Sequence, residues 1–360
     1  MGVLPKKVDF IIPADTGINK IEKLLIGGVE QSILIQGENK NHPVLLFLHG
    51  GPSMPLPGLS CRGRDYVLAT NTKELVKHFV VVFWDQRGTG KSYHSSIPRE
   101  TMRLTQFISD AVELVDYLRA GFNTEKLFLA GHSWGSVLGL HLVKDYPEKF
   151  FSYVGLSQIV SWVENDRLSL QWVKEEAKRR GNKKAMQELD AVGQPPFLES
   201  FEQWGVLRRW QARFNSMFFS DEQTKSPGMG RLAKIMLQSP DYSLKDIYHS
   251  LYKGFKLVYH MPFIDDLSNF NFRESGLKLT VPITFIHGRH DVHVVGSQVE
   301  DYYNRLEAPY GKQLIWVENS SHAFHPDDAS VIEKVLIEEK NRGGACHRPK
   351  FVESNNTDIL

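Results

Sequence analysis

The chain has 360 residues, of which 41% are hydrophobic and 24% are charged, a composition typical of a globular protein with a sizeable core. Its 43 Lys and Arg residues nearly balance its 42 Asp and Glu residues, so charge gives no reason to expect nucleic acid or an anionic membrane as a partner. No stretch approaches the roughly 20 consecutive apolar residues of a membrane-spanning helix.

The amino terminus indicates the cellular compartment, and the number of cysteines indicates whether disulfides or a zinc site are expected. Residues 1–7 contain no apolar run of signal-peptide length, and Lys6 stands where a myristoylation signal has Ser or Thr. Cys61 and Cys346 are too few for a disulfide framework or for a four-ligand zinc site. We therefore expect a cytoplasmic protein that needs no metal and no other cofactor. The sequence leaves the oligomeric state open.

The first part of the chain predicts strands. A hairpin is expected first, with its turn at Gly27 and Gly28 between the strands Ile21–Ile26 and Ser32–Gln36. Short, continuously apolar runs follow, and such runs are typical of strands buried on both faces of a parallel sheet. These runs are Val44–Leu48, Phe79–Trp84 and Leu127–Ala130.

Helices are predicted between and after these strands. Apolar residues recur at helical spacing from Ile108 to Leu118, with Thr105 as the expected N-cap and Gly121 near the end. A second helix follows Ser133, and the next strand is expected at Tyr153–Leu156. Strands that alternate with helices imply right-handed crossovers, and hence an α/β fold with a mostly parallel central sheet flanked by helices.

The pattern then changes. Residues 158–277 contain no clear buried strand and are rich in charged and scattered aromatic residues, which predicts a helical cap inserted into the α/β core. Strands resume at Val281–His287 and Leu314–Val317, and a last helix is expected over Asp328–Glu339. The predicted division is a core of residues 1–157 and 278–340, a cap of residues 158–277, and a poorly ordered tail of residues 341–360.

One motif points to chemistry. The run Gly131-His132-Ser133-Trp134-Gly135 matches G-x-S-x-G, and it follows a predicted strand and precedes a predicted helix. A serine on such a tight turn projects its hydroxyl from the end of the sheet, and glycines on both sides let the backbone pack closely. We therefore predict that Ser133 is a nucleophile.

A serine hydroxyl needs a base, and the base needs an acid that orients it. Asp291 and His322 are the candidates, because each lies just past the end of a predicted strand and they follow Ser133 in the order acid, then base. His325 is the alternative base. His290 and His293 are interpreted as supporting residues of the acid's loop.

Two backbone N–H groups are predicted to hold the oxyanion. The first is the N–H of Trp134, which lies at the start of the helix predicted after the Ser133 turn, where the helix dipole favours negative charge. The second is the N–H of Gly51, in the His49-Gly50-Gly51-Pro52 loop that follows the strand Val44–Leu48.

These segments together resemble the prolyl iminopeptidase group of the α/β-hydrolases. The resemblance covers about residues 20–157 and 278–340, and its segments are His49–Pro52, Asp85–Ser92, Gly131–Ser136, Gly288–Asp291 and the late His322. It implies the α/β-hydrolase fold with a helical cap insertion, and a serine hydrolase that releases an amino-terminal residue, often proline, from short peptides through an acyl-enzyme. It also implies that Asp85 and Arg87 brace the loop near the site.

Two departures from the group keep the substrate class open. Ser321 stands where the group has Gly before the catalytic His. The cap segment whose glutamates bind the substrate amine in members of the group is absent from this sequence. Glu164 is the cap carboxylate that we predict for an amine, although Glu199 and Glu202 are also available.

Cap aromatics offer a different kind of pocket. Trp162 and Phe218 are candidate substrate-binding residues, because aromatic side chains in a cap can form an apolar acyl pocket. The alternatives are thus an aminopeptidase acting on short peptides, a carboxylesterase acting on small esters, and a non-catalytic ligand-binding protein on the same fold.

Overall fold

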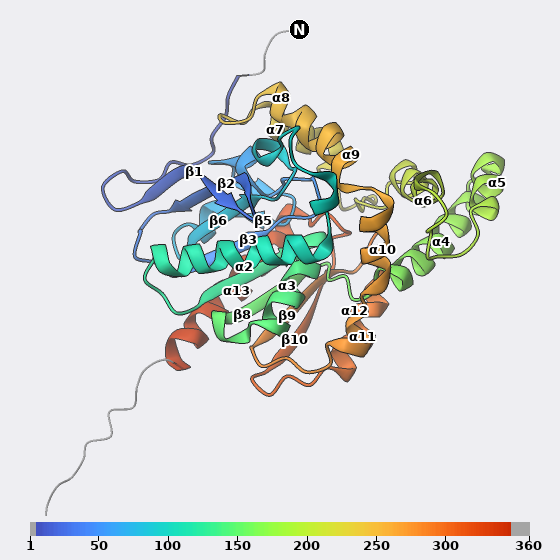
Figure 1. Cartoon of the computed structure of the whole chain (residues 1–360). Helices are drawn as coiled ribbons and strands as arrows, with labels where there is room; N and C mark the ends of the chain where they lie inside the picture. The colour runs from blue at the N-terminus through green and yellow to red at the C-terminus, as the bar shows by residue number, and fades with distance from the viewer. Residues whose placement is uncertain (1–4, 347–360) are drawn as a thin grey trace, which may run out of the picture.

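The computed structural model describes residues 5–346, and its centre is one eight-stranded sheet (Figure 1). Its strands are β1 Ile18–Ile26, β2 Val29–Gly37, β3 Val44–Leu48, β6 Val80–Asp85, β7 Leu127–His132, β8 Phe150–Leu156, β9 Ile283–Gly288 and β10 Lys312–Val317. They lie in the order β1-β2-β6-β3-β7-β8-β9-β10. The β1–β2 and β2–β6 pairs are antiparallel and the other pairs are parallel, which confirms the predicted mostly parallel sheet. The short strands β4 Tyr66–Val67 and β5 Thr70–Asn71 form a separate hairpin.

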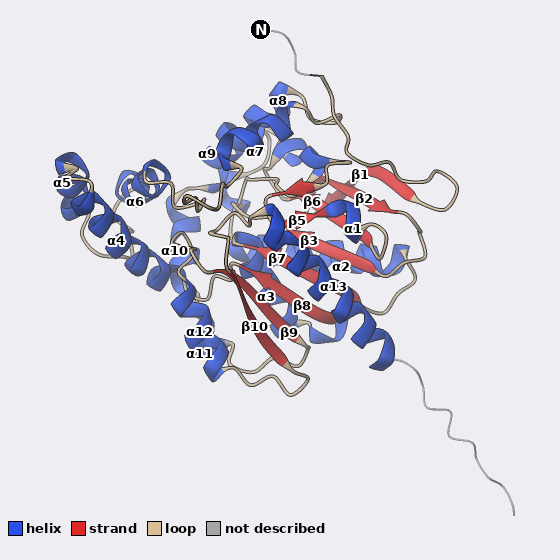
Figure 2. Cartoon of the chain, turned by 180° about the vertical axis from the view of Figure 1, so that it is seen from behind, coloured by secondary structure: helices blue, strands red, loops and turns tan. Residues whose placement is uncertain are grey.

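Helices cover both faces of the sheet. The α-helices of the described residues, some of which lie away from the sheet, are α1 Thr72–Leu75, α2 Leu104–Gly121, α3 Trp134–Asp145, α4 Trp162–Arg179, α5 Lys183–Ala191, α6 Phe201–Arg213, α7 Gly228–Leu237, α8 Leu244–Tyr248, α9 Phe255–Val258, α10 Met261–Asn269, α11 Phe272–Ser275, α12 Gly296–Arg305 and α13 Pro326–Cys346. Helices α2 and α3 lie over one face (Figure 1), and α1 and α13 lie over the other (Figure 2).

The continuous apolar strands are buried on both faces, as their composition predicts. In β3, Val44, Leu46 and Leu48 join the apolar cluster on the side of α2 and α3, whereas Leu45 and Phe47 join the cluster on the side of α13. Successive side chains of a strand point to opposite faces, so a run without polar residues feeds two cores at once.

The start of α2 differs from the prediction. The N-cap is Arg103, and Thr105 lies inside the helix. The carboxylate of Asp266, on α10, accepts the N–H of Leu104 at 3.0 Å and also pairs with Arg103 at 2.6 Å. A carboxylate from a distant helix thus satisfies the first free N–H of α2. The prediction of Thr105 as the N-cap was wrong because this long-range contact cannot be read from the local sequence.

The segment between β8 and β9 is helical. Helices α4 to α11 fall within the predicted cap range, and α4, α5 and α6 extend away from the sheet in both views (Figures 1 and 2). The division into core and cap remains a prediction. Helix α13 continues to Cys346, so residues 341–346 of the predicted tail are helical, and residues 347–360 lie outside the described residues. Within the part of the chain that the structure describes, no helix is long and apolar enough to cross a membrane.

A buried ion pair ties the edge of the sheet to α2. The guanidinium of Arg87, just after β6, donates to both oxygens of Asp110 at 2.7 and 2.9 Å and to the carbonyl of Gly27 at 2.8 Å. Gln31 of β2 donates to the same carboxylate at 2.7 Å. Both charged side chains are fully buried, so each depends on the other to compensate its charge.

Replacing Asp110 with alanine should destabilise the fold by about 3–5 kcal/mol, because Arg87 would remain buried without its counter-ion. The free energy of unfolding, measured by urea titration, checks this. Asp116→Ala is the matched control on the same helix, since its exposed ion pair with Lys149 should contribute at most about 1 kcal/mol. Equal effects of the two substitutions would contradict the assignment.

Candidate active site

Ser133 occupies the tight turn between β7 and α3. Its φ of 54° and ψ of −119° lie in a region that a residue with a side chain adopts at a cost of about 1–3 kcal/mol. Two glycines make the turn possible. A Cβ on Gly131 would lie 2.4 Å from the carbonyl oxygen of Gly135, and a Cβ on Gly135 would lie 2.2 Å from that of Leu48 at the end of β3.

Three side chains from separate segments form one hydrogen-bonded relay. The hydroxyl oxygen of Ser133 lies 3.0 Å from Nε2 of His322, and Nδ1 of His322 lies 3.0 Å from Oδ2 of Asp291. All three residues are buried. In this geometry an imidazole that is oriented by a carboxylate can take the proton of the hydroxyl as the hydroxyl attacks a carbonyl carbon. The structure thus brings together the three residues that the sequence predicts.

Asp291 follows β9 and accepts several hydrogen bonds. The hydroxyl of Ser157 donates to Oδ2 at 2.8 Å, and the N–H groups of His293 and Val294 donate to Oδ1 at 2.9 and 2.8 Å. Burial raises the pKa of this carboxyl, but His322, the neighbouring His287 and the N–H of Val294 together outweigh burial, and the pKa falls below its ordinary value. Asp291 is therefore ionised at neutral pH, the state that can orient His322 and stabilise its protonated form.

Two further imidazoles pack against His322. The ring of His132 lies 4.9 Å and the ring of His293 lies 4.6 Å from the His322 ring, centroid to centroid. Burial lowers the pKa of His132 to about 3 and holds that of His293 well below its ordinary value, so both rings are neutral. Nε2 of His132 lies 2.9 Å from the carbonyl of His322, and because a carbonyl only accepts, Nε2 donates. This bond anchors the loop that carries His322.

Gly51 and Trp134, whose N–H groups are the predicted oxyanion donors, both lie near Ser133. Trp134 is the first residue of α3, so its N–H has no acceptor within the helix. A Cβ on Gly50 would lie 3.2 Å from the Cβ of Ser133, and Gly51 lines the same pocket as Ser133. The two predicted donors therefore come from the loop after β3 and from the start of α3, the two segments that meet at this turn.

Gln86 connects these two segments. Its Oε1 accepts from the indole N–H of Trp134 at 2.8 Å, and its Nε2 donates to the carbonyl of His49 at 3.3 Å. The sequence resemblance implies such a role for the neighbours of Gln86. Asp85 instead accepts from the Tyr242 hydroxyl, and Arg87 pairs with α2. Among the three, Gln86 is thus the residue that contacts both segments carrying the predicted oxyanion donors, through the Trp134 side chain and the His49 backbone.

A small pocket of about 130 Å³ lies above Ser133. The helical segment supplies much of its lining, namely Trp162 and Asn165 of α4, Trp204 and Arg208 of α6, Phe255 of α9, and Tyr259. Pockets for drug-sized ligands usually measure about 300–1,000 Å³, so this one fits a small chemical group. Within the described part of the chain, none of the side chains that line it is a carboxylate.

Of the predicted substrate-binding residues, only one lies in the pocket above Ser133. Trp162 lines the pocket, but Glu164 and Phe218 do not. Glu164 lies two positions further along α4, about 200° around the helix axis, and is ion-paired within its own helix at 2.7 Å. Phe218 is buried in the apolar cluster on the side of α13. His325, the alternative base, faces the carboxylate of Asp327 at 3.5 Å, whereas His322 contacts the serine hydroxyl.

Sequence reasoning missed several residues of the site. Ser157 directly follows β8, and its place at a strand end was a usable signal. Asn165 donates to the carbonyl of His293 at 3.1 Å and so joins α4 to the acid's loop. Trp204 and Arg208 come from α6, and nothing in the sequence distinguishes them from the other aromatic and basic residues of the helical segment.

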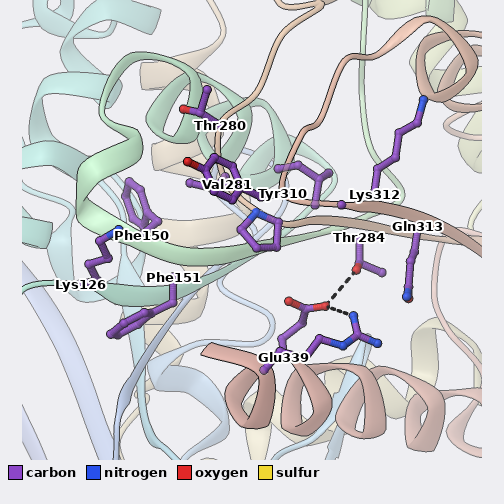
Figure 3. Close-up of a pocket in the computed structure, with 14 residues that line it drawn as sticks. Lys126, Phe150, Phe151, Thr280, Val281, Thr284, Tyr310, Lys312, Gln313 and Glu339 are labelled. Carbon is purple, nitrogen blue, oxygen red and sulfur yellow. Dashed lines mark hydrogen bonds and ion pairs between the residues drawn. The ribbon is translucent and has the colours of Figure 1, made fainter. Parts of the chain in front are cut away.

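A larger cavity of about 440 Å³ lies at the opposite end of the strands (Figure 3). The first residues of β8, β9 and β10 line it, and Glu339 of α13 accepts hydrogen bonds there from Thr284 at 3.5 Å and Arg342 at 2.9 Å. Among the described residues that line this cavity there is neither a serine nor a histidine. Since α/β sheets carry their reactive groups at the carboxyl ends of the strands, the candidate site is the pocket above Ser133.

Known proteins resemble this chain over most of its length. The sequence model of the family described as "Serine aminopeptidase, S33" matches residues 69–193. The probable aminopeptidase YbaC of Bacillus subtilis (strain 168) is 33% identical over 330 residues, which cover 91% of this chain and 98% of that protein.

Two solved structures share the fold. The proline iminopeptidase of Mycobacterium smegmatis has a TM-score of 0.62 at 15% identity, over 91% of this chain and 100% of the other. A proline iminopeptidase-related protein of Thermus thermophilus has a TM-score of 0.60 at 19% identity, over 89% and 97% of the two chains. At these identities the two structures establish the α/β-hydrolase fold and nothing finer.

Adding a single methyl group at Gly135 should abolish the geometry of the turn. In Gly135→Ala the new Cβ would meet the Leu48 carbonyl, so we expect destabilisation by about 1–3 kcal/mol and a loss of any hydrolytic activity of at least tenfold. Thermal unfolding and ester hydrolysis measure the two effects. Gly205→Ala on α6 is the control, because its Cβ meets no atom within 4 Å and should stabilise the helix by about 0.5–1 kcal/mol.

Proposed function

Because this chain belongs to the aminopeptidase-like α/β-hydrolases, we propose that it is a serine hydrolase that cleaves a small amide or ester bond through an acyl-enzyme on Ser133. The relay from the Ser133 hydroxyl through His322 to Asp291 is the observation that supports the proposal, with 3.0 Å at each contact. Backbone and side-chain hydrogen bonds outside the relay hold its members, so the groups are arranged before substrate binds.

In the first half of the reaction, the hydroxyl oxygen of Ser133 bonds to the substrate carbonyl carbon while Nε2 of His322 takes the hydroxyl proton. The π electrons of the carbonyl move to its oxygen, and the N–H groups of Gly51 and Trp134 donate to that oxyanion. Asp291 stabilises the imidazolium. The tetrahedral intermediate then collapses, and the leaving amine or alcohol departs with the proton from His322.

In the second half, water replaces the leaving group. Nε2 of His322 takes a proton from the water as its oxygen bonds to the acyl carbon. The same N–H groups hold the second oxyanion. When the intermediate collapses, the oxygen of Ser133 leaves and regains its proton from His322, and the carboxylic acid product is released.

Two substrate classes fit this chemistry. Release of an amino-terminal residue from a short peptide is supported by the relative named as a probable aminopeptidase. Hydrolysis of an ester or amide without a free amine is supported by the pocket, because none of the described side chains that line it is a carboxylate. A buried ammonium without a counter-ion is costly, so an aminopeptidase would need an acid in that position.

Removal of the Ser133 hydroxyl tests the acyl-enzyme. We expect Ser133→Ala to lower kcat for p-nitrophenyl butyrate by at least about 10³-fold, since members of such a relay act as a unit. A fluorophosphonate probe should label the wild type and not the variant. Ser330→Ala, on the exposed surface of α13, should behave as the wild type in both assays. Full labelling and turnover in Ser133→Ala would locate the nucleophile elsewhere.

Blocking the substrate amine separates the two substrate classes. An aminopeptidase should hydrolyse alanyl and prolyl p-nitroanilides and lose its activity when their amines are acetylated, because acetylation removes the charge that the enzyme would recognise. A hydrolase that ignores the amine should treat the free and acetylated forms alike. The ratio of kcat/KM within each pair is the measurement.

A further inference from the structure

Arg208 is the one ionised side chain among the described residues that line the pocket above Ser133. Its guanidinium carbon lies 5.5 Å from the ring centre of Trp162 and 5.1 Å from that of Trp204. Its Nη2 donates to both oxygens of Asp166 at 2.6 and 2.8 Å. Two aromatic rings and a carboxylate thus fix this positive charge in place.

Asp166 holds Arg208 without lining the pocket itself. Its side chain is 4% exposed, whereas that of Arg208 is 21% exposed. Burial raises the pKa of the Asp166 carboxyl, and the guanidinium of Arg208 opposes that effect. The Asp166 carboxylate therefore pairs with Arg208, and the guanidinium of Arg208 is the charged group that faces a substrate.

Hydrogen-bond donors of this pocket lack acceptors. Trp162 and Trp204 are only 9% and 3% exposed. Their indole N–H groups are buried and have no hydrogen-bond acceptor among the described residues. The hydrogen bonds of Arg208 to the described residues use its two terminal nitrogens, which leaves its Nε–H available to an acceptor. The two indole nitrogens are themselves buried, so the donor that meets a ligand in the pocket directly is the guanidinium of Arg208.

We propose that this pocket binds a carboxylate, and that the enzyme therefore acts on small substrates with a carboxylate close to the scissile bond. This inference rests on the proposed function, because it takes Ser133 as the attacking group. A carboxylate offers lone pairs to the guanidinium of Arg208. An ammonium offers only donors and would meet a like charge.

The carboxylate has two possible sources, and paired substrates distinguish them. On the acyl side, glutaric acid mono-p-nitroanilide is compared with its methyl ester and with 5-aminopentanoyl p-nitroanilide, which carries an ammonium at a similar distance. On the leaving side, the dipeptide alanyl-alanine is compared with alanyl-alanine amide. We expect the wild type to favour the carboxylate by about 10- to 100-fold in kcat/KM within one of the two series.

Substitution of Arg208 identifies the recognising group. In Arg208→Gln the ratio between the carboxylate and its neutral partner should fall towards one, whatever happens to the absolute rate. Because this change leaves Asp166 buried without its cation, the double variant Asp166→Asn/Arg208→Gln provides a second form whose folding is checked by thermal unfolding. Arg209→Gln, at the next position of α6 and paired with Glu188 on the surface, should keep the wild-type ratio.

The outcomes separate this inference from the proposed function. Equal rates within both series, or a preference for the ammonium substrate, would overturn the carboxylate site. A carboxylate preference that survives Arg208→Gln would assign it to another group and overturn the role of Arg208. If ester turnover persists in Ser133→Ala, the proposed function fails, whereas turnover that requires Ser133 but ignores charge overturns only the present inference.

Discussion

The close contact between the β7–α3 turn and the carboxyl end of β3 determines the geometry of the site. Glycine at position 135 lets the turn lie against the Leu48 carbonyl, where a Cβ would be only 2.2 Å away. This contact sets Ser133 beside the loop that carries Gly51, so the hydroxyl and the two N–H groups are placed by backbone instead of by flexible side chains. The positive φ of Ser133 is the conformational cost, and the packed strands on both sides offset it.

The helices above the sheet also support the relay. Asn165 of α4 donates to the carbonyl of His293 and accepts the N–H of Val295 at 3.0 Å, and the hydroxyl of Ser216 lies 2.8 Å from Nδ1 of His293. These contacts hold the loop that begins at Asp291. The elements that line the pocket above Ser133 therefore also hold the loop of Asp291, so the shape of the pocket and the alignment of the relay depend on the same contacts.

Two buried aspartates illustrate how surroundings decide the role of a carboxyl group. Asp291 accepts two backbone N–H groups and a hydroxyl in addition to His322, and these interactions keep it ionised in spite of burial. Asp166 has only Arg208, and burial dominates its pKa. Many donors hold the first carboxylate as an anion beside His322, whereas the second orients a cation towards the pocket.

The sequence alone determined the sheet and the candidate relay. Ser133 and Asp291 each follow a strand within a few residues, and His322 follows β10, so the parallel sheet delivers all of them to the same edge. Tertiary structure alone decided which residues face the pocket. Glu164 and Trp162 are two positions apart on α4 yet point in different directions, and Arg208 acquires its place from Asp166 and two tryptophans. The physical reason is that strand ends converge by hydrogen-bonded pairing, which is regular, whereas the face that a helix presents to a pocket depends on long-range packing, which leaves no local pattern.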